Sequence, residues 1–521
     1  MTTTSPPEHT PFGLPEIRTH IGSFLDHNDR INCILINRAW RDTMSSLLWE
    51  KVTLVDTDEV PHRPLQKISV PLEILQKNAG LVKTLIIQSE LFDDYFDITF
   101  PILQTVSFWP KRSTPYPKEP DAEAFDGLTN LIKRNPTISQ LKLGMSKGRH
   151  PAPDKLWVAM ATAPNLQLLE APRMRIRHST MPLFWKATEN LKALIVNFET
   201  ALRFSFTADG TSGPFLFPRL RRLSLEVSQA AHISEDDQIR LMSMCPQLES
   251  LDWFPGREFS PDKFLECCRA ETWPNLEGLT LARMDHYTDS DIKTILESMR
   301  KKVTILGVSR SGFGPRSFDA LRPHFFAGII ELDLSYCSAV TSPMIVEVLA
   351  SCKKMRKFAA GCVSAKDLVA SPPWICGSLR ELWVYFDMSY DDMPTEPSAT
   401  TDIQEADLVA AKERIQRQIF ERIAGLEMLQ SFSFSDPTRE IPTSSLDLRL
   451  GKGLELLSTL RELKGIHFHG TKQWMRTEDI QWMLDHWDHL HWMGGVMDIG
   501  DQNENAALVK MITDRGIFFA G

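Results

Sequence analysis

The sequence contains no Cys-x-x-Cys pair, although it has eight cysteines among 521 residues. Structural zinc sites usually draw on such closely spaced thiols, and scattered cysteines in a long chain are more often core residues than disulfide partners. No run of 18 or more apolar residues occurs, which argues against a membrane-spanning helix. The start, MTTTSPPEHTP, lacks the basic residues and apolar run of a secretory signal. We therefore expect a protein of the cytoplasm or nucleus, with no membrane partner and no structural metal.

An excess of positive charge is also missing. The chain has 58 Lys and Arg against 67 Asp and Glu, a net charge of -9, whereas proteins that bind nucleic acid by general electrostatic attraction are basic. We therefore expect no nucleic-acid partner. The sequence has no nucleophile elbow, Walker A loop, dinucleotide fingerprint or zinc-protease signature. We expect neither catalysis by this chain nor a cofactor.

A short stretch near the N-terminus, residues 14–52, predicts three helices. Its apolar residues recur at three- and four-residue spacing, which places them on helical faces, and a polar break at 26–29 offers capping side chains for the second helix. Three helices in under about 45 residues bury too little apolar surface to be stable alone. We therefore expect this unit to dock on another surface.

The residues of this stretch follow a recognisable order: Leu14-Pro15, Glu16-Ile17, Ile21, Phe24-Leu25, Asp29, Cys33, Arg38-Ala39-Trp40 and Leu48-Trp49. In this order and spacing the stretch resembles an F-box. In that family the helices bind a Skp-family adaptor, which joins the protein to a cullin-RING ubiquitin ligase, so the resemblance implies the same partner here. The residues that it assigns to docking, or to the fold that permits docking, are Leu14, Pro15, Ile17, Ile21, Leu25, Ile36, Trp40, Leu48 and Trp49.

A second interpretation of these helices stays open. They could form only a cap for the rest of the chain, because an apolar stripe that faces a core and one that faces a partner have the same spacing.

After this stretch one short pattern returns along the chain: two apolar residues separated by two others, then a third apolar residue two positions on. Clear copies include Ile138/Leu141/Leu143 and Leu379/Leu382/Val384, and the copies from Ile138 to Leu379 begin 24 to 29 residues apart. This period lies within or near the about 20 to 29 residues of a leucine-rich repeat. Each copy predicts a short strand, and the segment between copies predicts a helix, so the units should stack into a solenoid. Cys337 stands where this repeat takes an inward-facing Asn or Cys, and we expect a buried thiol there.

Taken together, the chain resembles an F-box leucine-rich-repeat protein over nearly its whole length. The implied fold class is α/β: a short N-terminal three-helix F-box followed by a leucine-rich-repeat solenoid, or horseshoe. The expected parts are a disordered tail at 1–12, the F-box at 13–55, a linker or capping segment at 56–80, the solenoid at 81–500 and a C-terminal cap at 501–521.

The period breaks once, between Leu379 and the copy at Leu429. These copies begin 50 residues apart, about twice the usual period. Residues 387–407 hold seven acidic residues and no Lys or Arg, a composition that predicts a mobile loop. We assign an acidic insertion to 387–411, followed by an amphipathic helix from Ile415 to Leu426 that rejoins the solenoid.

The concave face of the solenoid is the expected substrate surface, because residues between the inward-pointing apolar positions of each strand face it. Exposed aromatic residues on a rigid sheet can carry much of an interface's binding energy, so Trp383 and Tyr385 are the expected anchors. Alternatively, the acidic insertion folds over them. The concave-face candidates are Asp252, Phe254, Trp383, Tyr385, His467 and His469.

A local basic excess supplies three further candidates, Arg175, Arg177 and Arg222. Guanidinium groups suit a phosphorylated or acidic substrate segment, and an ordinary solvated edge is the alternative. His467 and His469 alternate on one strand and could ligate a metal, yet nothing in the sequence fixes a third ligand, so we expect no metal.

The resemblance implies a substrate-recognition adaptor of a Skp-cullin-F-box type ubiquitin ligase, with an unknown substrate protein held by the solenoid. Ubiquitin transfer would then occur on other subunits. Two alternatives stay open: a leucine-rich-repeat scaffold that supports no degradation, and a small-molecule receptor that uses the concave face. A deep closed pocket would favour the receptor.

Overall fold

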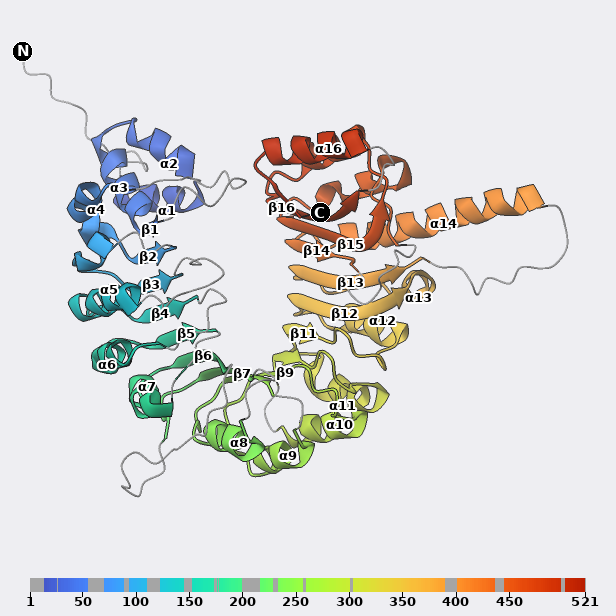
Figure 1. Cartoon of the computed structure of the whole chain (residues 1–521). Helices are drawn as coiled ribbons and strands as arrows, with labels where there is room; N and C mark the ends of the chain where they lie inside the picture. Colours follow the sequence, from blue (N-terminus) through green and yellow to red (C-terminus); the bar gives the residue numbers. More distant parts are fainter. Residues whose placement is uncertain are drawn as a thin grey trace, which may run out of the picture. The chain divides into compact units, whose positions relative to one another are not determined.

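The chain divides into two compact units, Met1–Cys245 and Pro246–Gly521 (Figure 1). Each unit combines helices with parallel strands, so the predicted α/β class holds in both. Within the described part of the chain, no helix is long and apolar enough to cross a membrane. The computed structural model describes residues 14–25, 27–54, 70–88, 93–109, 122–144, 152–172, 176, 178–198, 216–227, 233–255, 259–299, 303–388, 401–435, 445–497 and 502–520.

The three predicted N-terminal helices are confirmed. Helix α1 spans Pro15–Phe24, α2 spans His27–Ile34 and α3 spans Arg38–Trp49. Asn37 caps α3, since its side-chain oxygen accepts a hydrogen bond from the amide of Trp40 at 3.0 Å. Helix α3 contacts α1, α2 and the first strand of the sheet. The three helices therefore lead directly into the repeats.

The strands of the first unit form a parallel ladder in which each strand pairs with the next. The strands are β1 (Lys51–Leu54), β2 (Thr84–Ile87), β3 (Thr105–Phe108), β4 (Gln140–Leu143), β5 (Leu168–Ala171), β6 (Ala193–Phe198) and β7 (Arg222–Val227). The helical segments are α4 (Leu72–Asn78), η3 (Ala79–Leu81), η4 (Asp93–Asp97), α5 (Ala122–Arg134), α6 (Asp154–Thr162), η5 (His178–Thr180), α7 (Met181–Thr188) and α8 (Glu235–Ser243).

The second unit continues the same design, again with parallel neighbours. Its strands are β8 (Ser250–Phe254), β9 (Gly278–Leu281), β10 (Ile305–Gly307), β11 (Glu331–Asp333), β12 (Lys357–Ser364), β13 (Glu381–Asp387), β14 (Ser431–Ser433), β15 (Gly465–Gln473), β16 (Trp492–Met497) and β17 (Phe518–Ala520). Its helical segments are α9 (Pro261–Arg269), α10 (Asp289–Ser298), α11 (Pro315–Phe325), α12 (Ser342–Ser351), α13 (Ala365–Ala370), α14 (Thr401–Ala424), η6 (Leu450–Lys452), η7 (Leu454–Thr459), α15 (Thr477–His486) and α16 (Gln502–Asp514).

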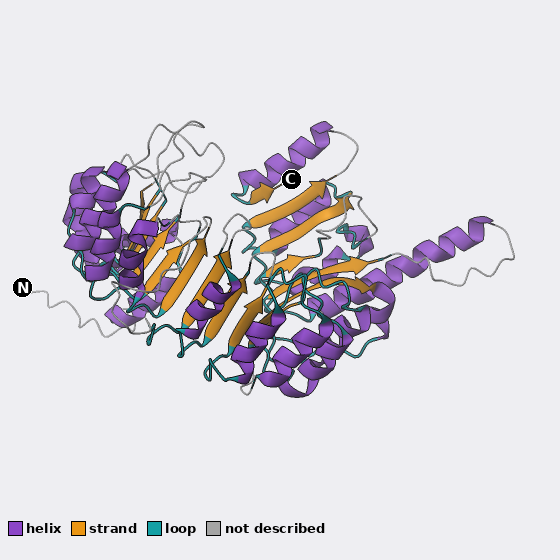
Figure 2. Ribbon diagram, turned by 60° about the horizontal axis from the view of Figure 1, so that its bottom comes forward, coloured by secondary structure: helices purple, strands orange, loops and turns teal. Residues whose placement is uncertain are grey.

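Helices line one side of the strands in each unit (Figure 2), and the core lies between the two layers. The predicted repeat positions are its apolar residues: Leu379, Leu382 and Val384, for example, are at most 2% exposed. Successive helices contact one another, as α5 contacts α6 and α10 contacts α11. A stack of strand and helix units of this kind is a repeat solenoid.

The repeats extend beyond the expected bounds of 81–500. Strand β1 begins at Lys51, inside the segment assigned to the F-box, and β17 ends at Ala520, inside the segment assigned to a cap. Strand β17 pairs with β16, and α16 precedes it. The C-terminal segment is therefore one more strand and helix unit.

The acidic insertion differs from its prediction. Residues 389–400 lie outside the described residues, but α14 begins at Thr401, so the second half of the predicted loop is helical. The predicted helix from Ile415 to Leu426 is present as the C-terminal part of α14, where Ile419 and Ile423 are buried. Helix α14 contacts α13 and η7, which fixes this end of the insertion to the repeats.

Capping residues start several of these helices as their spacing predicts. Thr288 and Asp291 form a capping box at α10, with the Asp291 amide donating to Thr288 and the Thr288 amide donating to Asp291. Pro261 and Pro343 lie in the first turns of α9 and α12.

Candidate functional site

Apolar side chains are exposed on α1, α2 and the turns around them. Leu35 is 78% exposed and Phe24 is 77% exposed, with Ile36 at 59%, Leu14 at 53% and Ile31 at 43%. We call these five residues the N-terminal apolar surface. Exposed apolar patches on soluble proteins commonly mark interaction sites.

These helices bury little of their own apolar surface. Among the described side chains of α1–α3, Met44 is the one apolar side chain that is fully buried, at 0% exposure. It contacts α1 where Gly22 leaves room for it: a Cβ at Gly22 would lie 2.6 Å from Met44 Cε. Arg18 is 7% exposed and donates a hydrogen bond to Thr43 Oγ1 at 3.2 Å, which ties α1 to α3 a second time.

The predicted adaptor-binding residues divide into two groups. Leu14, Pro15 and Ile36 are exposed. The others, which are Ile17, Ile21, Leu25, Trp40, Leu48 and Trp49, are partly buried. Their assignment to docking stays a prediction. The set omitted Phe24, Ile31 and Leu35, because spacing alone does not tell which apolar side chains remain outside the core.

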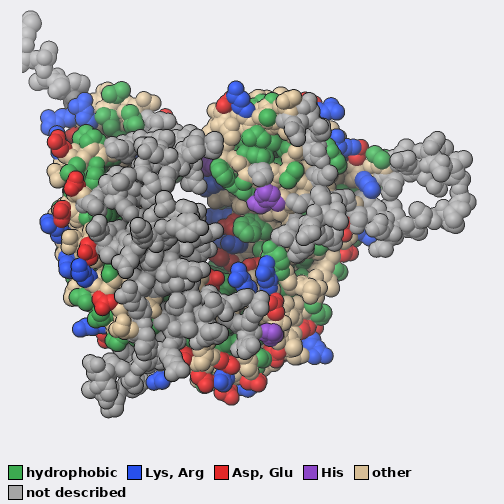
Figure 3. Space-filling model, in the orientation of Figure 1, with side chains coloured by type: hydrophobic (Ala, Val, Ile, Leu, Met, Phe, Trp, Pro, Cys, Tyr) green, Lys and Arg blue, Asp and Glu red, His purple; other side chains and the backbone are tan. Residues whose placement is uncertain are grey.

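On the strand side of the second unit, several aromatic side chains gather. Trp383 on β13 and Phe518 on β17 are each 46% exposed, and Trp492 on β16 is partly buried. His467 and His469 on β15 complete the group, which we call the aromatic face. Figure 3 shows hydrophobic and histidine side chains together on the visible face of the C-terminal repeats.

The strand register places these residues in two adjacent rows. One row aligns Trp383 with Ser433, His467 and Gly494. The other aligns Ser431 with Gly465, Trp492 and Phe518. The aromatic face therefore crosses the strands rather than following one of them.

His467 is held by three neighbours. Its ring stacks on Trp492, with centroids 4.4 Å apart, and meets His469 edge to face at 4.5 Å. Its Nδ1 lies 2.8 Å from Ser435 Oγ. Burial, with a smaller contribution from His469, lowers the pKa of His467 to about 4. The imidazole is therefore neutral at pH 7.

Two glycines make room for the flat Trp492 ring. A Cβ at Gly494 would lie 2.6 Å from the Cζ2 and Cη2 atoms of Trp492, and one at Gly465 would lie 3.4 Å from its Cε3. A side chain at Gly494 would displace the ring, whereas a Cβ at Gly465 would make only an ordinary van der Waals contact with it. Gly494 thus shapes the aromatic face without contributing a side chain to it.

Tyr385 does not belong to this face. It was expected to be exposed beside Trp383, but it is 3% exposed, and that expectation was wrong. The neighbouring strand β12 shifts its register between Ala359 and Cys362, so regular alternation fails at the level of Tyr385. Trp383 itself is exposed as expected; Lys357 Nζ lies 5.5 Å from its ring, and its Nε1 donates to Ser431 Oγ at 3.4 Å.

The remaining predicted substrate-binding residues do not join the aromatic face. Asp252 and Phe254 are partly buried on β8, at the start of the second unit. Arg222 is exposed on β7 of the first unit, and Arg175 and Arg177 lie outside the described residues. The structure therefore brings together Trp383, His467 and His469 from that set. It adds Trp492 and Phe518, which sequence reasoning missed because their copies of the repeat are weak or absent.

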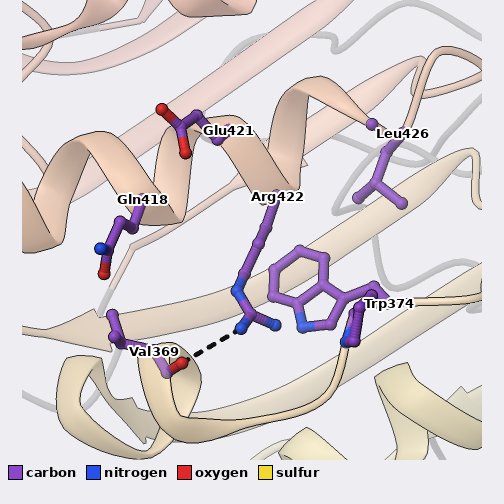
Figure 4. A pocket seen from close by; sticks show the side chains of 8 residues that line it. Val369, Trp374, Gln418, Glu421, Arg422 and Leu426 are labelled. Carbon is purple, nitrogen blue, oxygen red and sulfur yellow. Dashed lines mark hydrogen bonds between the residues drawn. The ribbon is translucent and has the colours of Figure 1, made fainter.

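A cavity of about 490 Å³ lies on the helical side of the second unit, between α13 and α14 (Figure 4). Arg422 projects into this region and donates hydrogen bonds to the carbonyls of Val369 at 3.2 Å and Ser371 at 2.7 Å. It thereby supplies hydrogen bonds to backbone carbonyl groups at the C-terminal end of α13. Since this cavity lies among helices, it does not support a receptor that uses the strand side.

The thiol of Cys337 is buried in the second unit. Cys337 is 5% exposed, as predicted; it donates to the carbonyl of Val308 at 3.0 Å, and burial raises its pKa. Within the described ranges, no group of three or more His, Cys, Asp and Glu could hold a metal ion.

Comparisons with known proteins give no family for the chain. No protein-family model and no curated protein matches it. Among solved structures, the chain is similar to a crystal structure of the Rad7 and Elc1 complex in yeast, at 15% identity over 64% of this chain and 87% of that chain, with a TM-score of 0.37. The Toll–Spatzle complex of Drosophila matches at 12% identity over 80% of this chain and 47% of that chain, with a TM-score of 0.27. Similarities this low support no functional conclusion.

Proposed function

We propose that this chain is a substrate-recognition adaptor of a Skp-cullin-F-box type ubiquitin ligase. Its N-terminal helices would dock a Skp-family adaptor, and its repeats would hold a substrate protein for ubiquitin transfer by other subunits. The observation that carries the proposal is the N-terminal apolar surface, because Leu35, Phe24 and Ile36 stay 59% to 78% exposed in a three-helix unit.

A helical cap for the repeats would be expected to bury its apolar stripe. Here α3 contacts β1, while the exposed side chains belong to α1, α2 and the turns around them. Fully burying one Leu, Ile or Phe side chain is worth about 1.5 to 3 kcal/mol. Leaving several of them in water is costly unless a partner covers them, which favours docking over capping.

The order of the three helices supports the same family. Three successive helices are present over the stretch whose sequence resembles an F-box, and Asn37 acts as the N-cap of the third.

The test is binding of purified Skp-family adaptor to the full chain and to two double variants. Leu35→Asp/Ile36→Asp places charge in the N-terminal apolar surface. Ile74→Asp/Val158→Asp is the matched control, since Ile74 and Val158 are exposed apolar residues of the same unit, at 46% and 44%, but lie on α4 and α6. We expect the wild type and the control variant to bind the adaptor and, through it, added cullin. The Leu35→Asp/Ile36→Asp variant should bind the adaptor at least about 100-fold more weakly, which corresponds to about 2.7 kcal/mol of binding free energy.

Circular dichroism and thermal unfolding show whether both variants remain folded. If the folded wild type does not bind the adaptor, the N-terminal helices are a cap and the scaffold alternative replaces the proposal. Equal loss in both variants would show that binding does not depend on this surface.

A further inference from the structure

A row of cations lies at the edge where strands of the second unit begin. Arg356, Arg380 and Lys464 each stand one residue before β12, β13 and β15. Backbone hydrogen bonds connect them: the amide of Arg380 donates to the carbonyl of Arg356 at 2.7 Å, and Lys464 is joined to Arg380 through Gln430. Lys353 lies in the same loop as Arg356. We call Lys353, Lys354, Arg356, Arg380 and Lys464 the basic edge; all five residues are exposed.

The basic edge is largely unneutralised. In the described part of the chain, none of its members has a carboxylate within ion-pair distance, whereas Lys357, one residue into β12, is paired with Glu381 at 3.1 Å. Three acidic residues, Glu427, Glu462 and Asp488, lie in neighbouring loops of the same edge. The edge therefore keeps net positive charge in a protein whose total charge is -9.

The basic edge lies at the start of strands that carry the aromatic face. Arg380 precedes β13 and is three residues before Trp383, and Lys464 precedes β15 and is three residues before His467, a distance of about 10 Å along each strand. Neighbouring strands lie about 4.8 Å apart, and an extended chain advances about 3.3 Å per residue. A segment that crosses from β12 to β17 would thus need about seven residues.

We infer that the second unit binds an extended acidic segment with interspersed aromatic side chains. The carboxylates of the segment pair with the basic edge, and its aromatic rings lie on Trp383, Trp492 and Phe518. The inference rests on the proposed function, which requires a substrate surface, and it deepens that function by naming the chemistry of the segment.

Charge complementarity selects this occupant over others. A basic segment would meet unneutralised Arg and Lys side chains, and like charges at an interface disfavour binding. An apolar segment without carboxylates would leave the basic edge unpaired. The face also supplies neutral stacking partners, because His467 is uncharged and held against Trp492.

The test uses fluorescein-labelled synthetic polymers and the full chain, with binding read as fluorescence anisotropy. The probe is a random copolymer of glutamate and tyrosine. Polyglutamate, a lysine–tyrosine copolymer and single-stranded oligothymidine serve as comparisons. We expect the glutamate–tyrosine copolymer to bind at least about tenfold more tightly than polyglutamate, about 1.4 kcal/mol. The lysine–tyrosine copolymer can bind acidic surfaces elsewhere on this chain of net charge -9, so we expect charge reversal at the basic edge not to weaken its binding. We expect weaker binding of the acidic probe as salt rises.

Variants then locate the site. Arg356→Glu/Arg380→Glu reverses two charges of the basic edge, and we expect it to lower the affinity for the glutamate–tyrosine copolymer at least about tenfold. Lys366→Glu/Lys510→Glu makes the same change of charge at exposed residues of α13 and α16, and we expect an effect below about twofold. Trp383→Ala should remove the advantage of the copolymer over polyglutamate. Thermal unfolding verifies that each variant is folded.

The inference is overturned if the wild type binds none of the acidic probes, if the two charge reversals weaken binding equally, or if oligothymidine binds more tightly than the copolymer. Equal affinity for polyglutamate and the copolymer would also overturn it, since the aromatic face would then play no part. Binding of the Skp-family adaptor is measured in the same variants, because its retention shows that the proposed function stands independently.

Discussion

Asp289 joins two successive repeats of the second unit, and its removal should weaken their junction. Its carboxylate accepts hydrogen bonds from the amides of Gly314 at 3.0 Å, Arg316 at 2.9 Å and Ser317 at 2.8 Å. The Ser317 hydroxyl donates to it as well, at 2.6 Å. These amides open α11, where Gly314 is the N-cap position and has no side chain to cap the helix. Asp289, at the start of α10, thus caps the next helix along the chain.

The structure allows the cost of Asp289→Ala to be worked out. Loss of an N-cap side chain costs about 0.5 to 2 kcal/mol, and hydrogen bonds to a charged group contribute about 1.5 to 3 kcal/mol. Several amides would become unpaired at one helix start, although water reaches part of this site. We therefore expect a loss of about 2 to 3 kcal/mol in the free energy of unfolding of the second unit. Asp289→Asn should cost less, about 1 kcal/mol, because one amide oxygen remains to accept.

The assay is urea unfolding of the full chain combined with hydrogen exchange, which reports the α11 amides separately from the first unit. Asp319→Ala is the control, since Asp319 lies on α11 but forms an exposed pair with Arg322 at 3.2 Å, and such pairs contribute about 0 to 1 kcal/mol. Burial opposes ionisation of Asp289, but its hydrogen bonds outweigh that effect and hold its pKa below 3.8. Its stabilisation is therefore present above about pH 4 and is lost as the pH falls through the lower, folded-state value. The reasoning is refuted if Asp289→Ala costs no more than Asp319→Ala, or if its cost is undiminished at pH 3.

Two further predictions concern the N-terminal helices and the aromatic face. Gly22→Val should separate α1 from α3, because its added side chain would collide with Met44 and Leu47. We expect it to lower the free energy of unfolding by about 1 to 3 kcal/mol and to weaken adaptor binding. Ser23→Val, at the exposed neighbouring position, is the control; equal effects would contradict the close helix contact. The pKa of His467 is lower in the folded chain than in the unfolded chain, so the unfolded chain binds a proton at higher pH than the folded chain does. The stability due to neutral His467 is therefore complete above about pH 6.5 and is lost as the pH falls toward 4. Urea unfolding should therefore show that His467→Phe reduces the loss of stability between pH 7 and pH 5 by about 1 kcal/mol, a value discounted because the ring is only half-buried. An equal loss in the variant and the wild type would contradict this effect.

The repeats were predictable because each unit buries the same apolar positions, which requires apolar residues at the same spacing in every unit. Strands β4 to β13 fall on the predicted copies from Ile138 to Leu379, and β14 falls on the copy at Leu429. Two further strands also follow the pattern: β1, outside the expected solenoid, at Trp49/Val52/Leu54, and β2, at its start, at Val82/Leu85/Ile87; both could have been found by extending the search. Strand β17 carries no complete copy, so its place follows only from its pairing with β16.

The failures have physical causes. The insertion was judged by its acidic composition, but residues 401–411 also contain Ala, Leu, Glu and Gln, which favour helix, and α14 forms there. Tyr385 was placed by strict alternation, which the register shift of β12 breaks. The ring of Trp492 on β16 lies beside Gly465 only when β15 and β16 pair. No local sequence signal reports such a contact between separate repeats.

The two proposed surfaces should act independently. The N-terminal apolar surface belongs to α1, α2 and their turns, which α3 joins to β1 in the first unit, whereas the aromatic face and the basic edge are built from β12 to β17 in the second. Their supporting contacts are made within their own units, and mutations at sites without shared partners usually have additive effects. We therefore combine Leu35→Asp/Ile36→Asp with Arg356→Glu/Arg380→Glu in one chain. For the adaptor and for the acidic probe alike, its loss of binding free energy should equal the sum of the losses measured in the two separate variants. A deviation above about 0.5 kcal/mol would show that adaptor docking and substrate binding are coupled.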